Sequence, residues 1–185
     1  MSLSKIKPEL NANDIVEVFN SVFAESHGTT LIGGADEPYY RVADGKATIY
    51  FREDFIASAL HEVSHWCLAG IERRQQNDYG YWYVADRDAE AQARFEAVEV
   101  KPQALEWLFS QLLGIPFRVS ADNLALENYD SLPFRRQVQE AAKKMVSQGL
   151  QGRALTFALA LNAYVRTDQG WCQVKERLNT GEIPN

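Results

Sequence analysis

The five residues His61-Glu62-Val63-Ser64-His65 constrain this chain more than any other stretch of its sequence. In a helix, residues four apart stand one turn above each other, so both imidazoles reach the same point in space. Two neutral imidazoles held in this way form half of a transition-metal site, and Glu62 places a carboxylate beside them that can handle protons. The alternative interpretation is two solvent-facing histidines on an ordinary helix.

The flanking residues favour a helix that starts at Phe55, with Asp54 as its N-cap and Gly70 at its end. Winding this segment at about 100° per residue gives a core-facing stripe on one side. The stripe consists of Ile56, Ala59, Leu60, Val63 and Cys67. His61 and His65 fall on another arc, so the helix can be anchored in a core while the histidines line a cleft.

Two imidazoles alone hold a divalent ion poorly, so a third ligand is required. The extended motif H-E-x-x-H-x-x-G-x-x-H is absent, because Leu68 and Ile71 stand where its glycine and its third histidine should be. The alternative is a carboxylate from a second helix, predicted over Asp88 to Val100, with Pro102 beyond its end. That helix carries three candidates: Glu90, Glu96 and Glu99.

Helix winding favours Glu90 as the third ligand. Small and apolar residues flank Glu90 on both sides, whereas Glu96 and Glu99 lie on the polar side of the predicted helix. A carboxylate in an apolar arc is costly unless it is paired or bound to metal. The alternative is an ion pair between Glu90 and Arg94, one turn on. If Glu90 binds the metal, Arg94 would hold that carboxylate from outside the ligand set.

Composition indicates one domain that spans residues 1–185, with 46% hydrophobic content to build a core. The net charge of −6 argues against a general nucleic-acid binder. Cys67 and Cys172 do not suggest a disulfide framework, and reduced thiols fit the cytoplasm. There is no apolar signal core, and the most apolar run, 155–165, is shorter than the roughly 20 residues that span a bilayer. We therefore expect a cytoplasmic protein without nucleic-acid or membrane partners.

The periodicity of the chain predicts an α+β fold, mostly α, with a small sheet beside a helical body. A helix is predicted over 12–25, and an Asp44-Gly45 hairpin turn follows from the residue types. Short strands are predicted near Thr30–Ile32, Tyr39–Val42 and Ala47–Phe51. Further helices are predicted over Gln103–Leu113, Pro133–Gln148 and Gly152–Tyr164, and around Trp171–Leu178.

Much of the chain resembles the bacterial elongation factor P hydroxylases. The likeness is carried by ALHEVSHWCLAGIERRQQNDYGYWYVADRDAEAQARFEAVEVKPQALEWLF, by FRVSADNL and by GRALTFALALNAY. It implies a metallopeptidase-like core that serves hydroxylation, with elongation factor P bearing a β-lysylated lysine as the substrate. It also implies a metal held by His61, His65 and a downstream glutamate, which position and helix face identify as Glu90.

Two histidines and one carboxylate suit two chemistries. The set is typical of non-haem iron(II) oxygenases, in which dioxygen and substrate meet at the metal. Zinc in the same site would activate water for peptide hydrolysis, with Glu62 as general base. Ligand identity does not separate these, and the resemblance favours iron(II) with dioxygen as co-substrate. A non-catalytic, structural metal site is the third hypothesis. The sequence contains no glycine-rich nucleotide fingerprint and no cysteine cluster set, so we expect no flavin or nucleotide site.

Aromatic residues between the two predicted metal helices are candidates for substrate binding. Tyr79, Tyr81, Trp82 and the neighbouring Tyr83 could surround a long cationic side chain, since ammonium groups are attracted to ring faces. The alternative is a short strand that packs one of its faces. Trp66, directly after the second histidine, either walls the pocket or packs into the core. Basic clusters that could dock an acidic protein are Arg73-Arg74, Arg135-Arg136 and Lys143-Lys144.

Overall fold

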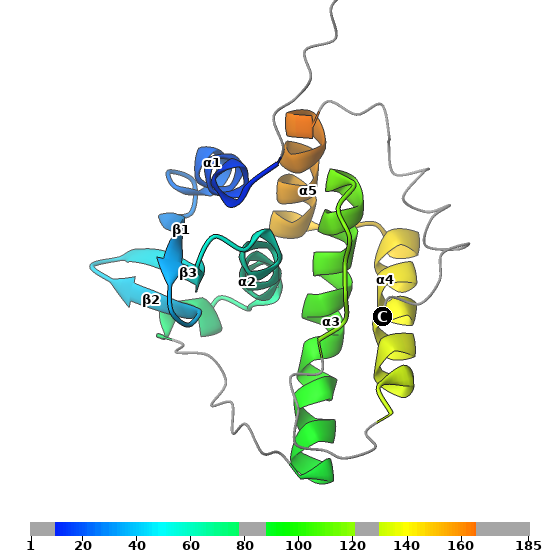
Figure 1. The fold of residues 1–185 in the computed structure, drawn as a ribbon. Coiled ribbons are helices and arrows are strands. Elements are labelled where there is room, and N and C mark those ends of the chain that lie inside the picture. Colours follow the sequence, from blue (N-terminus) through cyan, green and yellow to red (C-terminus); the bar gives the residue numbers. More distant parts are fainter. Residues whose placement is uncertain (1–9, 78–87, 121–129, 166–185) are drawn as a thin grey trace, which may run out of the picture.

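The computed structural model describes residues 10–77, 88–120 and 130–165 (Figure 1). Its helices are α1 (Ala12–Phe23), α2 (Ile56–Leu68), the short 3₁₀ helix η1 (Arg73–Gln75), α3 (Ala89–Leu113), α4 (Leu132–Gln148) and α5 (Gly152–Val165). Its strands are β1 (Thr29–Ala35), β2 (Tyr39–Ala43) and β3 (Lys46–Arg52). The predicted α+β fold with a small sheet is therefore confirmed. The helix predicted around 171–178 lies outside the described residues.

The three strands form one sheet in the order β1-β3-β2. β1 runs parallel to β3, and β2 pairs with β3 as an antiparallel hairpin. The hairpin turn is at Asp44 and Gly45, whose φ angles of 52° and 72° are the left-handed values that a type I′ turn requires. This confirms the turn predicted from the Asp-Gly pair.

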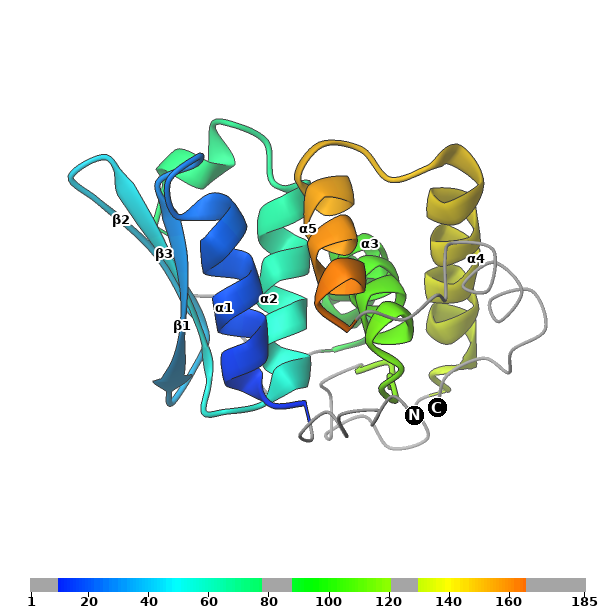
Figure 2. The ribbon, with the colours of Figure 1, turned by 90° about the horizontal axis from the view of Figure 1, so that it is seen from above.

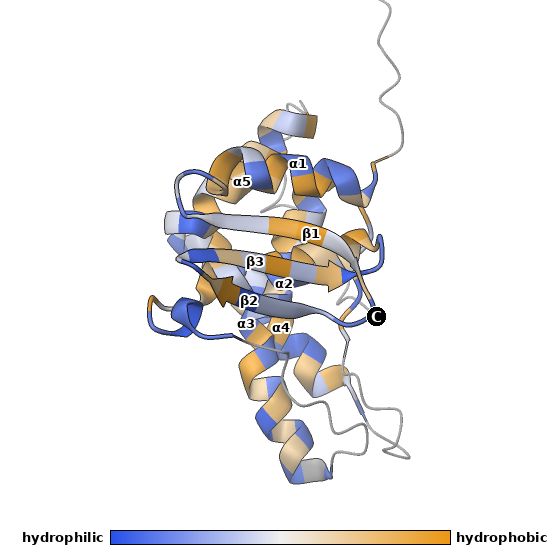
Figure 3. Ribbon diagram, turned by 90° about the vertical axis from the view of Figure 1, so that its left-hand side faces the viewer, coloured by the Kyte–Doolittle hydropathy of each residue, from blue (hydrophilic) through white to orange (hydrophobic). Residues whose placement is uncertain are grey.

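The elements are stacked in layers (Figure 2). Seen from above, the sheet comes first, then α1 with α2, then α5 with α3, and finally α4. The buried face of β3, made of Ala47, Ile49 and Phe51, is directed at the helices. The strands lie in front of the helices when the sheet faces the viewer (Figure 3). One apolar cluster runs from this sheet face through α1 and α2 to α3, α4 and α5.

The helix that carries the two histidines begins one residue later than predicted, and its predicted cap is wrong. Phe55 precedes the first turn, and no side chain caps α2 at this end. Asp54 is exposed and makes no such bond. The hydroxyl of Ser58 instead accepts a hydrogen bond from the backbone N–H of Arg52, 3.0 Å away, which ties the first turn of α2 to the end of β3.

The other end of α2 is held by an arginine from α5. The Arg153 guanidinium donates from Nη2 to the carbonyl oxygens of Trp66, Cys67 and Ala69, at 2.9, 3.1 and 2.6 Å. The central guanidinium carbon of Arg153, Cζ, also lies 4.8 Å from the centre of the Trp66 ring, within cation–π range. The last carbonyls of a helix lack partners within the helix and carry partial negative charge, so a cation stabilises them.

The second predicted metal helix does not end before Pro102. α3 continues through this proline to Leu113 and ends at Gly114, whose φ of 70° is left-handed. A proline inside a helix costs about 3 kcal/mol, because it removes a backbone hydrogen bond and crowds the preceding turn. Here burial of the following segment offsets that cost. Its buried apolar residues are Ala104, Leu105, Trp107, Leu108, Phe109 and Leu112.

The helices α4 and α5 appear close to their predicted bounds. Phe134, Val138 and Ala142 of α4 are buried, as are Phe157 and Leu161 of α5. None of the helices in the described part of the chain is long and apolar enough to cross a membrane.

Candidate metal centre

His61 and His65 project from the side of α2 that faces α3. Their Nε2 atoms are 3.0 Å apart, and their ring centres are 4.7 Å apart at an interplanar angle of 75°. The side chains are 20% and 29% exposed, so both rings are partly buried between the helices. Nitrogens that each lie about 2.1 Å from a shared ion would be about 3.0 to 3.4 Å apart. The two rings are therefore spaced as ligands of one ion.

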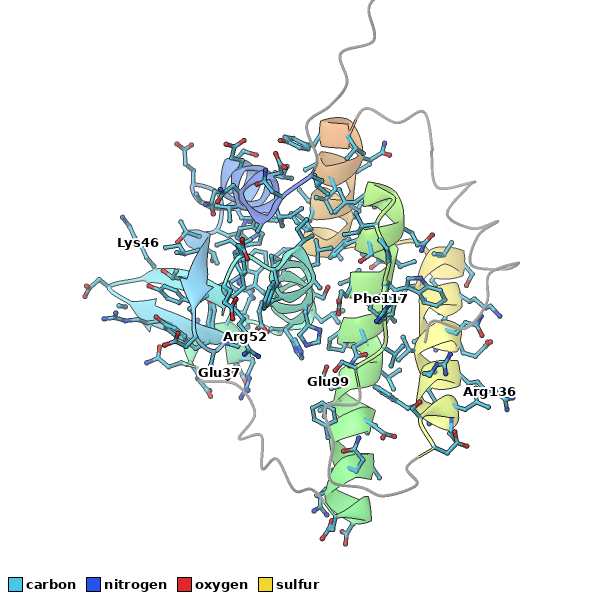
Figure 4. All side chains as sticks on the ribbon, in the orientation of Figure 1. Glu37, Lys46, Arg52, Glu99, Phe117 and Arg136 are labelled. Carbon is cyan, nitrogen blue, oxygen red and sulfur yellow. The ribbon has the colours of Figure 1, made fainter. Side chains whose placement is uncertain are left out.

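Glu99 of α3 completes the group. Its Oε2 is 3.4 Å from His61 Nε2, and its Oε1 is 3.3 Å from His65 Nε2. Ligand atoms of the three residues all lie within 4.8 Å of one another. The Glu99 side chain is only 1% exposed, and Figure 4 shows it on the side of α3 that faces α2. The structure thus brings together one carboxylate and two imidazoles from helices far apart in the chain.

Glu90, the ligand predicted from helix winding, is not in this group. Its side chain is 82% exposed and forms an ion pair with Arg94, itself 67% exposed. This is the ion pair that the sequence offered as the alternative, so Arg94 holds Glu90 at the surface and not against a metal. Glu99 lies nine positions after Glu90, which is about 13 Å along the helix axis. Glu96, the third candidate, accepts a hydrogen bond from the Gln92 side chain at 2.9 Å.

The helix boundary explains why winding favoured Glu90. Before Pro102 the arc that looks apolar is largely exposed, at Ala93, Ala97 and Val98, because the buried face of the full α3 follows the apolar residues that come after the proline. On that face lie Glu99, Gln103 and Glu106, spaced four and three residues apart and all buried. Neither Gln103 nor Glu106 is singled out by the sequence reasoning above. Their helical spacing from Glu99 is a signal that would have revealed them.

Both additional residues contact the site. Glu106 Oε2 is 2.8 Å from His61 Nδ1, the ring nitrogen that faces away from His65. Gln103 lies 3.5 Å from Glu99 Oε2 and is itself held by the backbone of Ser120, accepting from its N–H at 3.0 Å and donating to its carbonyl at 2.7 Å. The carboxylate and one imidazole are therefore each supported by a second side chain of α3.

The electrostatics of the group follow from two buried acids beside two imidazoles. Burial alone would raise the pKa of Glu99, but the close contact and charge of His65, together with His61, hold it below the ordinary value. Burial raises the pKa of Glu106, with His61 opposing the shift. For His61, burial lowers the pKa, but the hydrogen bond and charge of Glu106, with Glu99 and Glu62, raise it to about 10. The group therefore attracts positive charge.

These residues fit a bound divalent cation. Glu99 Oε1 is buried and has no hydrogen-bond partner among the described residues. No Lys or Arg within the described ranges pairs with Glu99 or Glu106. A buried carboxylate oxygen without a partner is costly, and a metal ion removes that cost. Imidazole nitrogen and carboxylate oxygen are ligands that iron(II) and zinc both accept.

The remaining candidate residues have different outcomes. Glu62 lies on α2 next to His61, is partly buried, and its charge contributes to the raised pKa of that histidine. Trp66 is 4% exposed and packs edge-on against Phe19 and Phe23 in the core. This packing fits the alternative, in which the Trp66 ring belongs to the core. The aromatic candidates Tyr79, Tyr81, Trp82 and Tyr83 lie outside the described residues.

A small sheet beside a helical body, with an H-E-x-x-H helix facing a buried glutamate, defines a class of proteins with a candidate mononuclear metal site. The chain belongs to the elongation factor P hydroxylase family, whose sequence model matches residues 18–175. A protein of Haemophilus influenzae named elongation factor P lysine hydroxylase is 44% identical over 164 residues, which cover 86% of this chain and 92% of that protein.

Proposed function

We propose that this protein adds one hydroxyl group to the β-lysylated lysine side chain of translation elongation factor P. The observation that carries the proposal is the 44% identity, over most of both chains, to a protein named elongation factor P lysine hydroxylase. The cluster of His61, His65 and Glu99 supports it, because hydroxylation of a C–H bond needs a redox-active metal and these residues could hold one. Membership of the elongation factor P hydroxylase family supports the same reaction. Family membership does not favour the zinc-peptidase alternative.

The cofactor in this proposal is one divalent transition metal, iron(II), held by His61, His65 and Glu99. These three side chains would hold the ion, and the ion would supply the redox chemistry for C–H oxidation. One oxygen atom of dioxygen enters the C–H bond and the other leaves as water. The balance requires two electrons and two protons, which an external reductant must provide.

Side chains around the ligands take supporting parts in the proposal. Glu62 lies beside His61 and is the residue to which we assign the handling of protons at the site. Tyr79, Tyr81 and Trp82 are proposed to surround the cationic substrate side chain, because ring faces attract ammonium groups. Docking of elongation factor P is assigned to the basic clusters, each of which has one exposed member: Arg73, Arg136 (labelled in Figure 4) and Lys144. A translation factor as substrate also implies a cytoplasmic protein.

The direct experiment is intact-mass analysis of β-lysylated elongation factor P after incubation with the protein, iron(II), air and a reductant. We expect a gain of one oxygen atom that requires air. Substitution of zinc(II) for iron(II) should abolish the gain, since zinc has no accessible redox change. His61→Ala is the matched negative control. Cleavage fragments in the zinc reaction, lost in Glu62→Gln, would instead support a peptidase and contradict the proposal.

A further inference from the structure

Glu106 is a buried acid with a single partner. Its side chain is 9% exposed, and His61 Nδ1, 2.8 Å from its Oε2, is its one hydrogen-bond and ion-pair partner among the described residues. Large apolar side chains surround it in sequence, with Leu105, Trp107 and Leu108 all buried. A carboxylate in such a place is costly unless its charge is used. The free-energy cost of burying the Glu106 carboxylate therefore needs a reason beyond packing.

The contact with His61 is directional. An imidazole that donates its Nδ1–H to a carboxylate keeps its lone pair on Nε2, and His61 Nε2 is the atom that faces His65 and Glu99. His65 has no comparable acceptor at its Nδ1 within the described residues. The support is thus specific to one histidine of the pair.

We propose that Glu106 is a positioning residue of the metal centre: it fixes the tautomer and ring orientation of His61, so that Nε2 is presented to the ion, and its charge makes that nitrogen a stronger donor. The inference rests on the metal centre of the proposed function, but not on the identity of the substrate. Carboxylates that hold the outer nitrogen of a ligand histidine act in this way, and their loss weakens metal binding about 10- to 100-fold.

The test compares cobalt(II) binding by the full chain and its variants, followed by the visible absorption of the bound ion. Glu106→Gln retains an oxygen that can accept the Nδ1–H but loses the charge, and we expect about 10-fold weaker binding. Glu106→Ala loses both, and we expect about 100-fold weaker binding. Glu90→Gln, which removes an exposed charge from the same helix, is the matched control and should bind as the parent does.

Thermal unfolding of the metal-free proteins separates positioning from a merely structural role. We expect the metal-free Glu106→Gln protein to fold but to be less stable than the parent, because it loses the charged pair with His61, so metal affinity is compared per folded molecule. Unchanged cobalt(II) affinity in this variant would overturn the proposal. A loss of metal-free stability with unchanged affinity per folded molecule would overturn it in favour of a structural role.

A second measurement needs no variant. In the zinc-loaded parent protein, ¹⁵N NMR of the histidine rings should show His61 protonated at Nδ1 and bound through Nε2, with slow exchange of that proton. Coordination through Nδ1, or failure of the parent to bind cobalt(II) or zinc(II), would overturn the inference. Metal binding as described without hydroxylation of elongation factor P would instead count against the proposed function alone.

Discussion

At the scale of single residues, burial separates the acids of α3 in a different way from helix winding, which favoured Glu90. Glu99 is 1% exposed and touches both histidines, whereas Glu90 is 82% exposed and is satisfied by Arg94. A solvated ion pair of this kind contributes little to stability and places no demand on the fold. The buried Glu99 carboxylate, beside two imidazoles, is stabilised only if its charge is balanced by a proton or a cation. This difference is the reason for proposing Glu99 as the third ligand.

The assignment predicts a clear contrast between two substitutions on one helix. Glu99→Gln should remove a ligand and lower metal affinity by more than the roughly 10- to 100-fold typical of an outer partner. Glu90→Gln should retain the parent's metal content, since its side chain is exposed. Elemental analysis of the two purified proteins checks this. A metal-free Glu90→Gln protein beside a fully loaded Glu99→Gln protein would reverse the assignment.

A second prediction concerns protons. Because the pKa of His61 is raised to about 10, the metal-free site holds a proton at neutral pH, and the ion must displace it. Metal affinity should therefore rise with pH, by about tenfold per unit for one displaced proton, up to about pH 10. Calorimetric titration in two buffers of different protonation enthalpy measures the released proton directly. Binding heats that do not depend on the buffer would refute the prediction.

At the scale of elements, the site depends on how α2 is anchored at both ends. Ser58 ties its first turn to β3, and Arg153 of α5 holds its last carbonyls. The partner of α2 is β3 in one contact and α5 in the other, and the hydrophobic periodicity of α2 predicts neither contact. They set the axial position of the helix, and so decide where along α3 the two histidines point.

Removal of the Arg153 side chain should therefore destabilise the folded protein measurably. We expect Arg153→Ala to lower the free energy of unfolding by about 2 kcal/mol, because it loses charged hydrogen bonds to three carbonyls and the contact with Trp66. The expected decrease in melting temperature is about 4 to 8 °C. Denaturant unfolding checks the value. Arg153→Lys should recover part of the loss, since it keeps the charge without the planar fork. A melting temperature equal to the parent's would show that the clamp contributes nothing.

At the scale of the whole molecule, the residues of the candidate metal centre come from two layers of the fold. His61 and His65 belong to the layer of α1 and α2 against the sheet, and Glu99 belongs to the next layer of α3 and α5 (Figure 2). An ion bound at this position connects segments that are remote in the chain. Such a ligand set does not exist in the unfolded protein, so binding energy adds to folding stability.

This geometry predicts that metal raises global stability. With free ion at about 100 times its dissociation constant, the expected gain is about 2.7 kcal/mol, or roughly 5 to 10 °C in melting temperature. Thermal unfolding with added ion and with a chelator measures the gain. His65→Ala should unfold at a temperature that does not respond to either addition. A parent protein with the same melting temperature in both conditions would contradict the site.

Much of the fold could be predicted from local patterns. Apolar spacing in α1, α4 and α5, the Asp44-Gly45 turn and the three short strands all appear as expected. These features depend on neighbours in sequence, so the chain itself specifies them. The same holds for His61 and His65, because a four-residue spacing on any helix places two rings together.

The third ligand, in contrast, could not be predicted from local sequence patterns. Its identity depends on whether α3 continues through Pro102, and no local rule decides that, since a proline usually ends or kinks a helix. The burial of Leu105, Leu108 and Phe109 against neighbouring helices outweighs the local cost of the proline and rotates Glu99 toward α2. The motif thus determined that two imidazoles would share a point in space. The packing of whole helices decided which carboxylate faces them, because burial energy is summed over the molecule and not over a segment.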